Sequence, residues 1–81
     1  MLFYFDVRDR GQQFSDEEGQ DLPDARAAED EAAEAAVAIA ADVLPQRRSG
    51  EVIVEVRDQS RELLLTVSVE LRIAHSVIPK R

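Results

Sequence analysis

The sequence contains no cysteine and a single histidine, His75, among its 81 residues. Without cysteine the chain has no disulfide, no thiolate zinc site and no cysteine nucleophile. One histidine with no nucleophile beside it makes neither a catalytic triad nor a typical zinc site, so we expect it at the surface or at a partner contact. No glycine-rich phosphate loop, GxSxG or HExxH motif is present. The sequence therefore predicts a protein that is not an enzyme and that holds no cofactor and no metal.

Long apolar runs are also missing. No stretch approaches the roughly 20 apolar residues of a membrane span. The first nine residues lack the basic region and the apolar length of a signal peptide, so we expect a cytoplasmic protein. The chain has room for one domain, residues 1–81, whose core is thin because a chain this short buries only about 60% of its unfolded surface.

Positive charge is scarce, with 10 basic against 17 acidic residues and a net charge of −7. Nucleic acids and anionic membranes need a clustered positive surface, so we expect neither as a partner. The adjacent basic pairs, Arg47-Arg48 and Lys80-Arg81, are interpreted as helix-end and tail charges that aid solubility.

The longest pattern runs from Glu62 to Ile73, where odd positions are apolar and even positions, except Leu64, are polar. A period of two predicts a strand with one buried face, at about residues 62–73. Shorter strands are expected at about residues 2–8, 12–15 and 51–57. The first of these is apolar on both faces at its start, as in an interior strand, whereas the second is polar and typical of an edge.

An alanine-rich helix is expected at about residues 24–44, with Asp24 as its N-cap or Pro23 at its first position, and with Pro45 as its stop. Its apolar residues form two stripes about 120° apart. The main stripe is Ala25, Ala28, Ala32, Ala35, Ala36, Ile39 and Val43, and the second is Ala33, Val37, Ala40 and Leu44. One sheet does not easily cover both, so Val37 and Leu44 are expected off the buried face.

These elements predict an α+β fold in the order ββαββ, with one four-stranded, mainly antiparallel sheet and the helix on one face. The first and last strands have the most apolar faces and are expected in the centre. Residues 74–81 either extend the last strand or leave it as a loose tail.

A five-residue pattern occurs twice, as Phe5-Asp6-Val7-Arg8-Asp9 and as Val54-Glu55-Val56-Arg57-Asp58. Two hairpins that end alike on either side of a helix would fit an internal duplication. The alternative is that this pattern simply ends a strand well, because Asp favours turns and Arg pairs across strands.

Several short motifs resemble a family of small bacterial proteins of unknown function, found in rhizobia and related α-proteobacteria. They are Tyr4-Phe5-Asp6-Val7-Arg8-Asp9, Asp16 with Glu18-Gly19, Leu22-Pro23-Asp24, Glu55-Val56-Arg57-Asp58 and Leu64-Leu65-Thr66-Val67. The resemblance implies no activity and no site residues. Members usually have glycine at the Ser60 position and leave the last strand soon after Val67, so here the second turn needs a different backbone and the strand is longer.

Two acidic groups are candidate sites of chemistry. Asp16, Glu17, Glu18, Asp21 and Asp24 carry oxygen donors suited to Ca²⁺, but their spacing is not that of a calcium loop, and we interpret them as a solvated loop. The carboxylates of Asp6, Asp9 and Asp58 lie at strand ends and would form an acid–base site if they met, although general acid–base chemistry also needs a cleft that raises one pKa. Turn capping is the preferred interpretation.

The remaining signal is apolar surface. Leu2, Tyr4, Ile53 and Leu64 are expected on the sheet face away from the helix, and Leu71 and Ile73 beyond the end of the helix. We therefore predict an interface made by Leu2, Tyr4, Val37, Leu44, Ile53, Leu64, Leu71 and Ile73. An exposed apolar set of this kind indicates association, so a homodimeric protein–protein interaction or regulatory module is predicted. An antitoxin-like or ligand-sensing domain is the alternative, and a small hydrolase or metal enzyme fits least.

Overall fold

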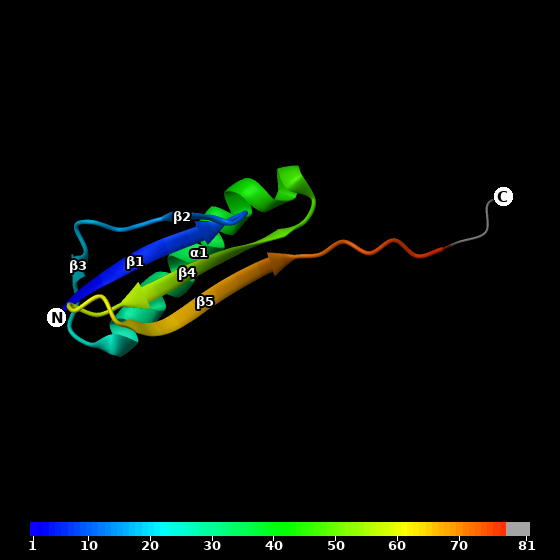
Figure 1. Cartoon of the computed structure of the whole chain (residues 1–81). Helices are drawn as coiled ribbons and strands as arrows, with labels where there is room; N and C mark the ends of the chain where they lie inside the picture. The colour runs from blue at the N-terminus through cyan, green and yellow to red at the C-terminus, as the bar shows by residue number, and fades with distance from the viewer. Residues whose placement is uncertain (78–81) are drawn as a thin grey trace.

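The computed structural model describes residues 1–77 and has one helix on one face of an antiparallel sheet (Figure 1). Its elements are β1 (Leu2–Asp9), β2 (Gln12–Phe14), β3 (Gln20–Asp21), α1 (Ala25–Arg47), β4 (Gly50–Arg57) and β5 (Leu63–Leu71). The predicted α+β fold is confirmed. The sheet has five strands rather than four, because the loop before the helix adds the two-residue strand β3. Residues 78–81 of the predicted tail lie outside the described residues.

The strands lie in the order β2-β1-β4-β5, all antiparallel, with β3 pairing with the first residues of β1. The expectation that the last strand is central is wrong. A tight turn joins β4 to β5 as a hairpin, while β1 occupies the other edge of β4. The strand β5 therefore forms an outer edge of the sheet.

The buried residues of α1 form a single row with a spacing of four, at Ala28, Ala32, Ala36, Ala40 and Leu44. Each step of four residues advances about 40° around a helix, so this row runs obliquely to the axis. The row begins on the predicted main stripe, with Ala28, and ends on the second stripe, with Leu44. A single sheet therefore contacts residues of both stripes. The prediction that Leu44 stays off the buried face is therefore wrong, whereas Val37 remains 58% exposed.

The core lies between α1 and the sheet. Phe3 of β1 and Val52, Val54 and Val56 of β4 have no exposed surface, and neither have the alanines at 28, 32 and 36. Because alanine has a small side chain, the helix axis can approach the sheet closely while the strands supply most of the core volume.

The two ends of α1 are fixed by different contacts. Asp24 is the N-cap, and its carboxylate accepts a hydrogen bond from the Ala27 amide at 2.9 Å. The predicted stop at Pro45 is wrong, since the helix continues to Arg47. A proline this close to the end removes one helical hydrogen bond. The helix then closes at Arg48, which is left-handed (φ 66°) and donates its amide to the Leu44 carbonyl.

The strand β5 is shorter than the predicted 62–73. Its last residue, Leu71, pairs with Gly50, the first residue of β4, so the hairpin offers no further partner along β4. Figure 1 shows the chain continuing from β5 in an extended path away from the sheet and helix. The register slips between Val56 and Arg57, which inserts Leu64 as an extra residue near the start of β5.

Candidate functional site

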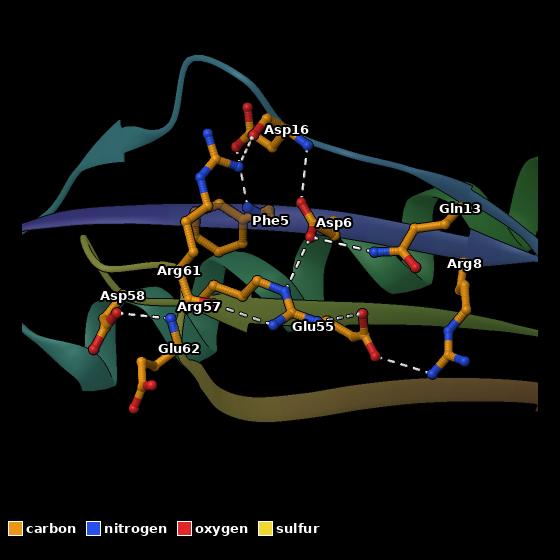
Figure 2. Close-up of polar contacts among 10 residues, drawn as sticks. All are labelled: Phe5, Asp6, Arg8, Gln13, Asp16, Glu55, Arg57, Asp58, Arg61 and Glu62. Carbon is orange, nitrogen blue, oxygen red and sulfur yellow. Dashed lines mark hydrogen bonds and ion pairs between the residues drawn. The ribbon is translucent and has the colours of Figure 1, made fainter.

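The sheet face away from the helix carries an ionic network (Figure 2). Asp6 of β1 lies directly opposite Glu55 of β4. The Arg57 guanidinium bridges both carboxylates, with Nε 3.1 Å from Asp6 Oδ2 and an Nη 3.2 Å from Glu55 Oε1. Arg8 reaches the other Glu55 oxygen at 2.9 Å. The side chains of Asp6 and Glu55 are only 5% and 9% exposed. This face is therefore occupied at its centre by buried charge.

Asp16 fastens the loop between β2 and β3 to the edge of β1. Its carboxylate accepts hydrogen bonds from the backbone amides of Phe5, Glu18 and Gly19 at 3.0–3.1 Å. Its own amide donates to Asp6 at 2.8 Å. The Phe5 amide lies on the edge of β1, at the gap between β2 and β3, where no strand pairs with it. The Asp16 carboxylate supplies the hydrogen-bond acceptor that this amide needs. Asp16 is therefore half-buried and bonded to the edge of β1, whereas the other acids of the interpreted solvated loop, Glu17, Glu18, Asp21 and Asp24, are exposed.

Two aspartates have pKa values below the ordinary 3.8. Burial raises the pKa of Asp16, but three backbone amide donors and the nearby Arg61 charge together lower it by more. For Asp9, the hydrogen bonds from Arg47 are the largest cause of the lowered pKa. That pair is bidentate, with Nη–Oδ distances of 2.6 and 3.0 Å. Both carboxylates are held in the ionised form.

The suggested meeting of Asp6, Asp9 and Asp58 does not occur. Asp6 pairs across the sheet with Glu55, while Asp9 is bound by Arg47 at the end of α1. Asp58 caps the β4–β5 turn, accepting hydrogen bonds from the Ser60 and Glu62 amides at 2.9 Å. Turn capping, the preferred interpretation, is confirmed for Asp58.

Across residues 1–77, no three His, Asp or Glu side chains are grouped so as to hold a metal ion. No helix within the same residues is long and apolar enough to span a membrane. A hollow of about 330 Å³ at the far end of β1 is lined by Arg8, Arg10 and Arg47. Arg8 and Arg47 are already paired with Glu55 and Asp9, which offsets much of its positive charge.

The structure separates the apolar residues that were expected on the open face. Leu2 and Tyr4 lie at one end of β1, where the Arg61 guanidinium stacks 3.7 Å from the centroid of the Tyr4 ring. Ile53 lies opposite Arg8 on the far side of the ionic network. All three are half-buried. The open face therefore lacks the continuous apolar patch that the sequence suggested.

Leu64 does not take the predicted open face. It lines a hollow together with Phe3 and Ala25, which belong to the helix side of the sheet. The reason is the extra residue near the start of β5, which interrupts the alternation of side chains. Leu44, at 2% exposure, belongs to the core and is not available to a partner.

The remaining predicted residues gather along the outer edge of β5. Val37 of α1 lines a shallow apolar groove of about 270 Å³ with Val69 and Leu71 of β5. Leu71 is half-buried, and Ile73, just past the strand, is 43% exposed. Among residues 1–77, no strand pairs with the outer side of β5. We define this strand edge and groove as the candidate site.

Sequence reasoning missed the residues that organise the opposite face. The roles of Asp16, Arg57 and Arg61 depend on contacts between segments 45–51 residues apart or on loop geometry. One signal was available. When β1 and β4 pair, the repeated acid-Val-Arg sequence places Asp6 opposite Glu55. Each arginine of the repeat then lies diagonal to the acid on the other strand. This cross-pairing supports the interpretation of the repeat as a strand-pairing pattern.

The fold and these sites define a small α+β protein whose buried charges are paired with one another. The chain matches the model of the family described as a domain of unknown function (DUF6894) over residues 2–70. The protein therefore belongs to that family of unknown function. No curated protein and no solved structure matches the chain.

Proposed function

We propose that the protein is a non-enzymatic interaction module that self-associates by pairing the outer edge of β5 with the same edge of a second copy. The observation that carries this proposal is a nine-residue outer strand, unpaired on one side across residues 1–77 and flanked by an apolar groove. An unpaired edge presents backbone donors and acceptors that another strand can satisfy.

The composition of β5 favours such pairing. Between Leu63 and Leu71 there is no proline, glycine or lysine, the residues by which proteins commonly blunt an exposed edge. Its one irregularity lies at the Leu64 end. Leu65, Val67 and Val69 pack on the helix-side core and are half-buried, so a second strand would complete their burial.

Charge selects one register of a symmetric antiparallel pair. With the two-fold axis at Val67, the midpoint of β5, the extra residue at Leu64 places Glu62 beside the partner's Leu71 and Arg72 at both ends. Moving the axis to Thr66 would place Glu62 beside the partner's Val69 and Glu70 and would bring like charges near each other. Opposite charges across strands contribute roughly 0.2–1 kcal/mol each, whereas like charges are destabilising. The first register is therefore favoured.

This arrangement also covers the groove. A two-fold axis perpendicular to the sheet puts both helices on the same side of one continuous sheet. Val37 lies on the side of α1 that borders β5, so each copy would turn its Val37 and groove toward the helix of the other. The most exposed valine of the helix would then have a contact.

Light scattering and sedimentation test the proposal, starting from a chain mass of 9.1 kDa. The exposed residues Thr66 and Ser68 lie opposite each other across the proposed axis. Thr66→Lys/Ser68→Lys should shift the protein to monomer, because two lysine pairs are created. Thr66→Lys/Ser68→Glu should keep the dimer, because each lysine then faces a glutamate. A wild-type protein that stays monomeric at millimolar concentration, or equal masses for both variants, would contradict the proposal.

A further inference from the structure

The segment Arg72–Val77 follows β5 but has no strand to pair with on β4, and it keeps apolar residues at the odd positions 73 and 77, with His75 between them. Ile73 and Val77 occupy odd positions, as do Leu65, Val67, Val69 and Leu71, which face the helix side. Ile73 is 43% exposed and Val77 fully exposed. Figure 1 shows the segment projecting from the end of β5 clear of the sheet and helix. The two large apolar side chains of this segment, Ile73 and Val77, have no surface that covers them within residues 1–77.

An uncovered apolar hollow lies at the opposite end of β5. Its volume is about 370 Å³, and its apolar walls are Met1, Leu2, Phe3, Ala25 and Leu64. The β4–β5 turn, residues 58–60, forms its rim. The hollow opens beside the first residues of β5, on the helix side, where Ala25 begins α1.

Antiparallel pairing of two β5 edges brings these two features together. With the axis at Val67, Ile73 lies beside the partner's Arg61 and Ser60, where the partner chain turns back toward β4, and His75 continues past that turn. The overhanging segment thus runs beside the rim of the partner's hollow. Continuing the alternation of β5, in which Leu65, Val67, Val69 and Leu71 pack on the core, places Ile73 and Val77 on the helix side, the side of the hollow's walls Phe3 and Ala25.

We propose that the Arg72–Val77 segment of one copy docks along the β4–β5 turn of the second copy, with Ile73 and Val77 covering its hollow. This arm exchange rests on the proposed self-association through β5 and specifies its second contact. It assigns a role to the part of the chain that extends past the sheet, and it occurs twice in a symmetric dimer.

Disulfide trapping tests the proposal cleanly, because the chain contains no cysteine. Ile73→Cys/Ser60→Cys should form a covalent dimer under mild oxidation, since these two positions lie side by side between copies. Thr66→Cys/Ser68→Cys reports separately on the β5 pairing. Ile73→Cys with Glu29→Cys, an exposed helix position, is the control and should give little dimer.

The outcomes separate the two proposals. Trapping of the 66/68 pair without the 73/60 pair overturns the arm exchange and leaves the β5 dimer standing. Failure of both overturns the self-association itself. An equal yield of covalent dimer in the control also overturns the arm exchange. It would show that the cysteines react through random encounters of two molecules and not through a specific contact.

A second measurement uses the wild-type background. Ile73→Asp should raise the dimer dissociation constant at least about tenfold, because burying a side chain of this size contributes roughly 1.5–3 kcal/mol. Ala74→Asp, one residue later on the other face, should change it little. Equal effects of the two substitutions overturn the arm exchange.

Discussion

Asp6 and Glu55 lie directly opposite each other on the two central strands, and a single guanidinium, that of Arg57, bonds to both carboxylates. Like charges opposite each other in a sheet repel. Here Arg57 lies diagonal to Asp6, and Arg8 lies diagonal to Glu55, so each acid is bonded to an arginine of the other strand. The arrangement specifies the register of β1 against β4, because a slip by one residue would turn these charges toward the core.

Removing Arg57 should therefore cost more than removing an ordinary surface arginine. Arg57→Ala leaves two nearly buried acids without their shared partner, and we expect a loss of about 2–3 kcal/mol, near the lower end of the cost of breaking a buried pair. Combining it with Asp6→Asn and Glu55→Gln should recover part of the loss. Urea unfolding followed by circular dichroism measures both. Equal stabilities of Arg57→Ala and the exposed Arg26→Ala would contradict the bridging role.

Gly19 and Gly11 provide a matched pair, since both have φ of +77°. A Cβ at Gly19 would lie 2.9 Å from Leu2 Cδ1 and 3.1 Å from the Phe3 carbonyl oxygen, whereas at Gly11 it would meet nothing within 4 Å. Gly11→Ala should cost about 1 kcal/mol for the left-handed backbone alone. Gly19→Ala should cost about 2–4 kcal/mol, because a steric term is added. Thermal unfolding of the two variants measures the difference, and equal losses would show that the loop yields freely.

Stability should fall on acidification through Asp16 and Asp9. Their folded-state pKa values are lowered below 3.8, so their contribution is complete above pH 3.8 and is lost as the pH falls through the lower folded values. At pH values below 3.8, we expect the urea concentration at the unfolding midpoint to decrease. Asp16→Asn should be less stable at pH 7 and should lose less on acidification. Parallel pH profiles for wild type and variant would rule out the contribution of Asp16.

The alanine row of α1 should resist larger side chains. Ala36 has no exposed surface, so Ala36→Leu must push the helix from the sheet and should cost about 1–3 kcal/mol. Ala38→Leu, two residues later on an exposed part of the helix, should change stability by less than about 0.5 kcal/mol. Denaturant unfolding compares them. Equal stability of the two variants would show that the helix can move away from the sheet without cost.

The periodic parts of the sequence predicted the fold well. The alternation over 62–73 and 51–57 gave strands, and the alanine-rich segment gave a helix capped by Asp24. Non-local choices could not be obtained in this way. Strand order depends on which strand pairs with the edge of β4 that the β4–β5 hairpin leaves free. The alternation of apolar and polar residues carries no information about that choice.

The errors at Leu44, Pro45 and Leu64 have separate physical causes. Leu44 is buried because the contact row crosses the helix obliquely, which a fixed stripe does not anticipate. Pro45 is tolerated because only Gln46 and Arg47 follow it in the helix, so the bend that it imposes displaces little of the helix. Leu64 changes face because one extra residue enters the strand. The sequence predicts three residues of the candidate edge, Val37, Leu71 and Ile73, but it places the strand in the centre of the sheet.

The ion pairs between β1 and the second half of the chain have a kinetic consequence. Arg47–Asp9, Arg8–Glu55 and Arg57–Asp6 join residues 38, 47 and 51 positions apart. Loops of that length close at an entropic cost before any contact offsets it, whereas α1 and the β4–β5 hairpin need only nearby residues. Docking of β1 against β4 is therefore the step expected to set the folding rate, with these three pairs formed late.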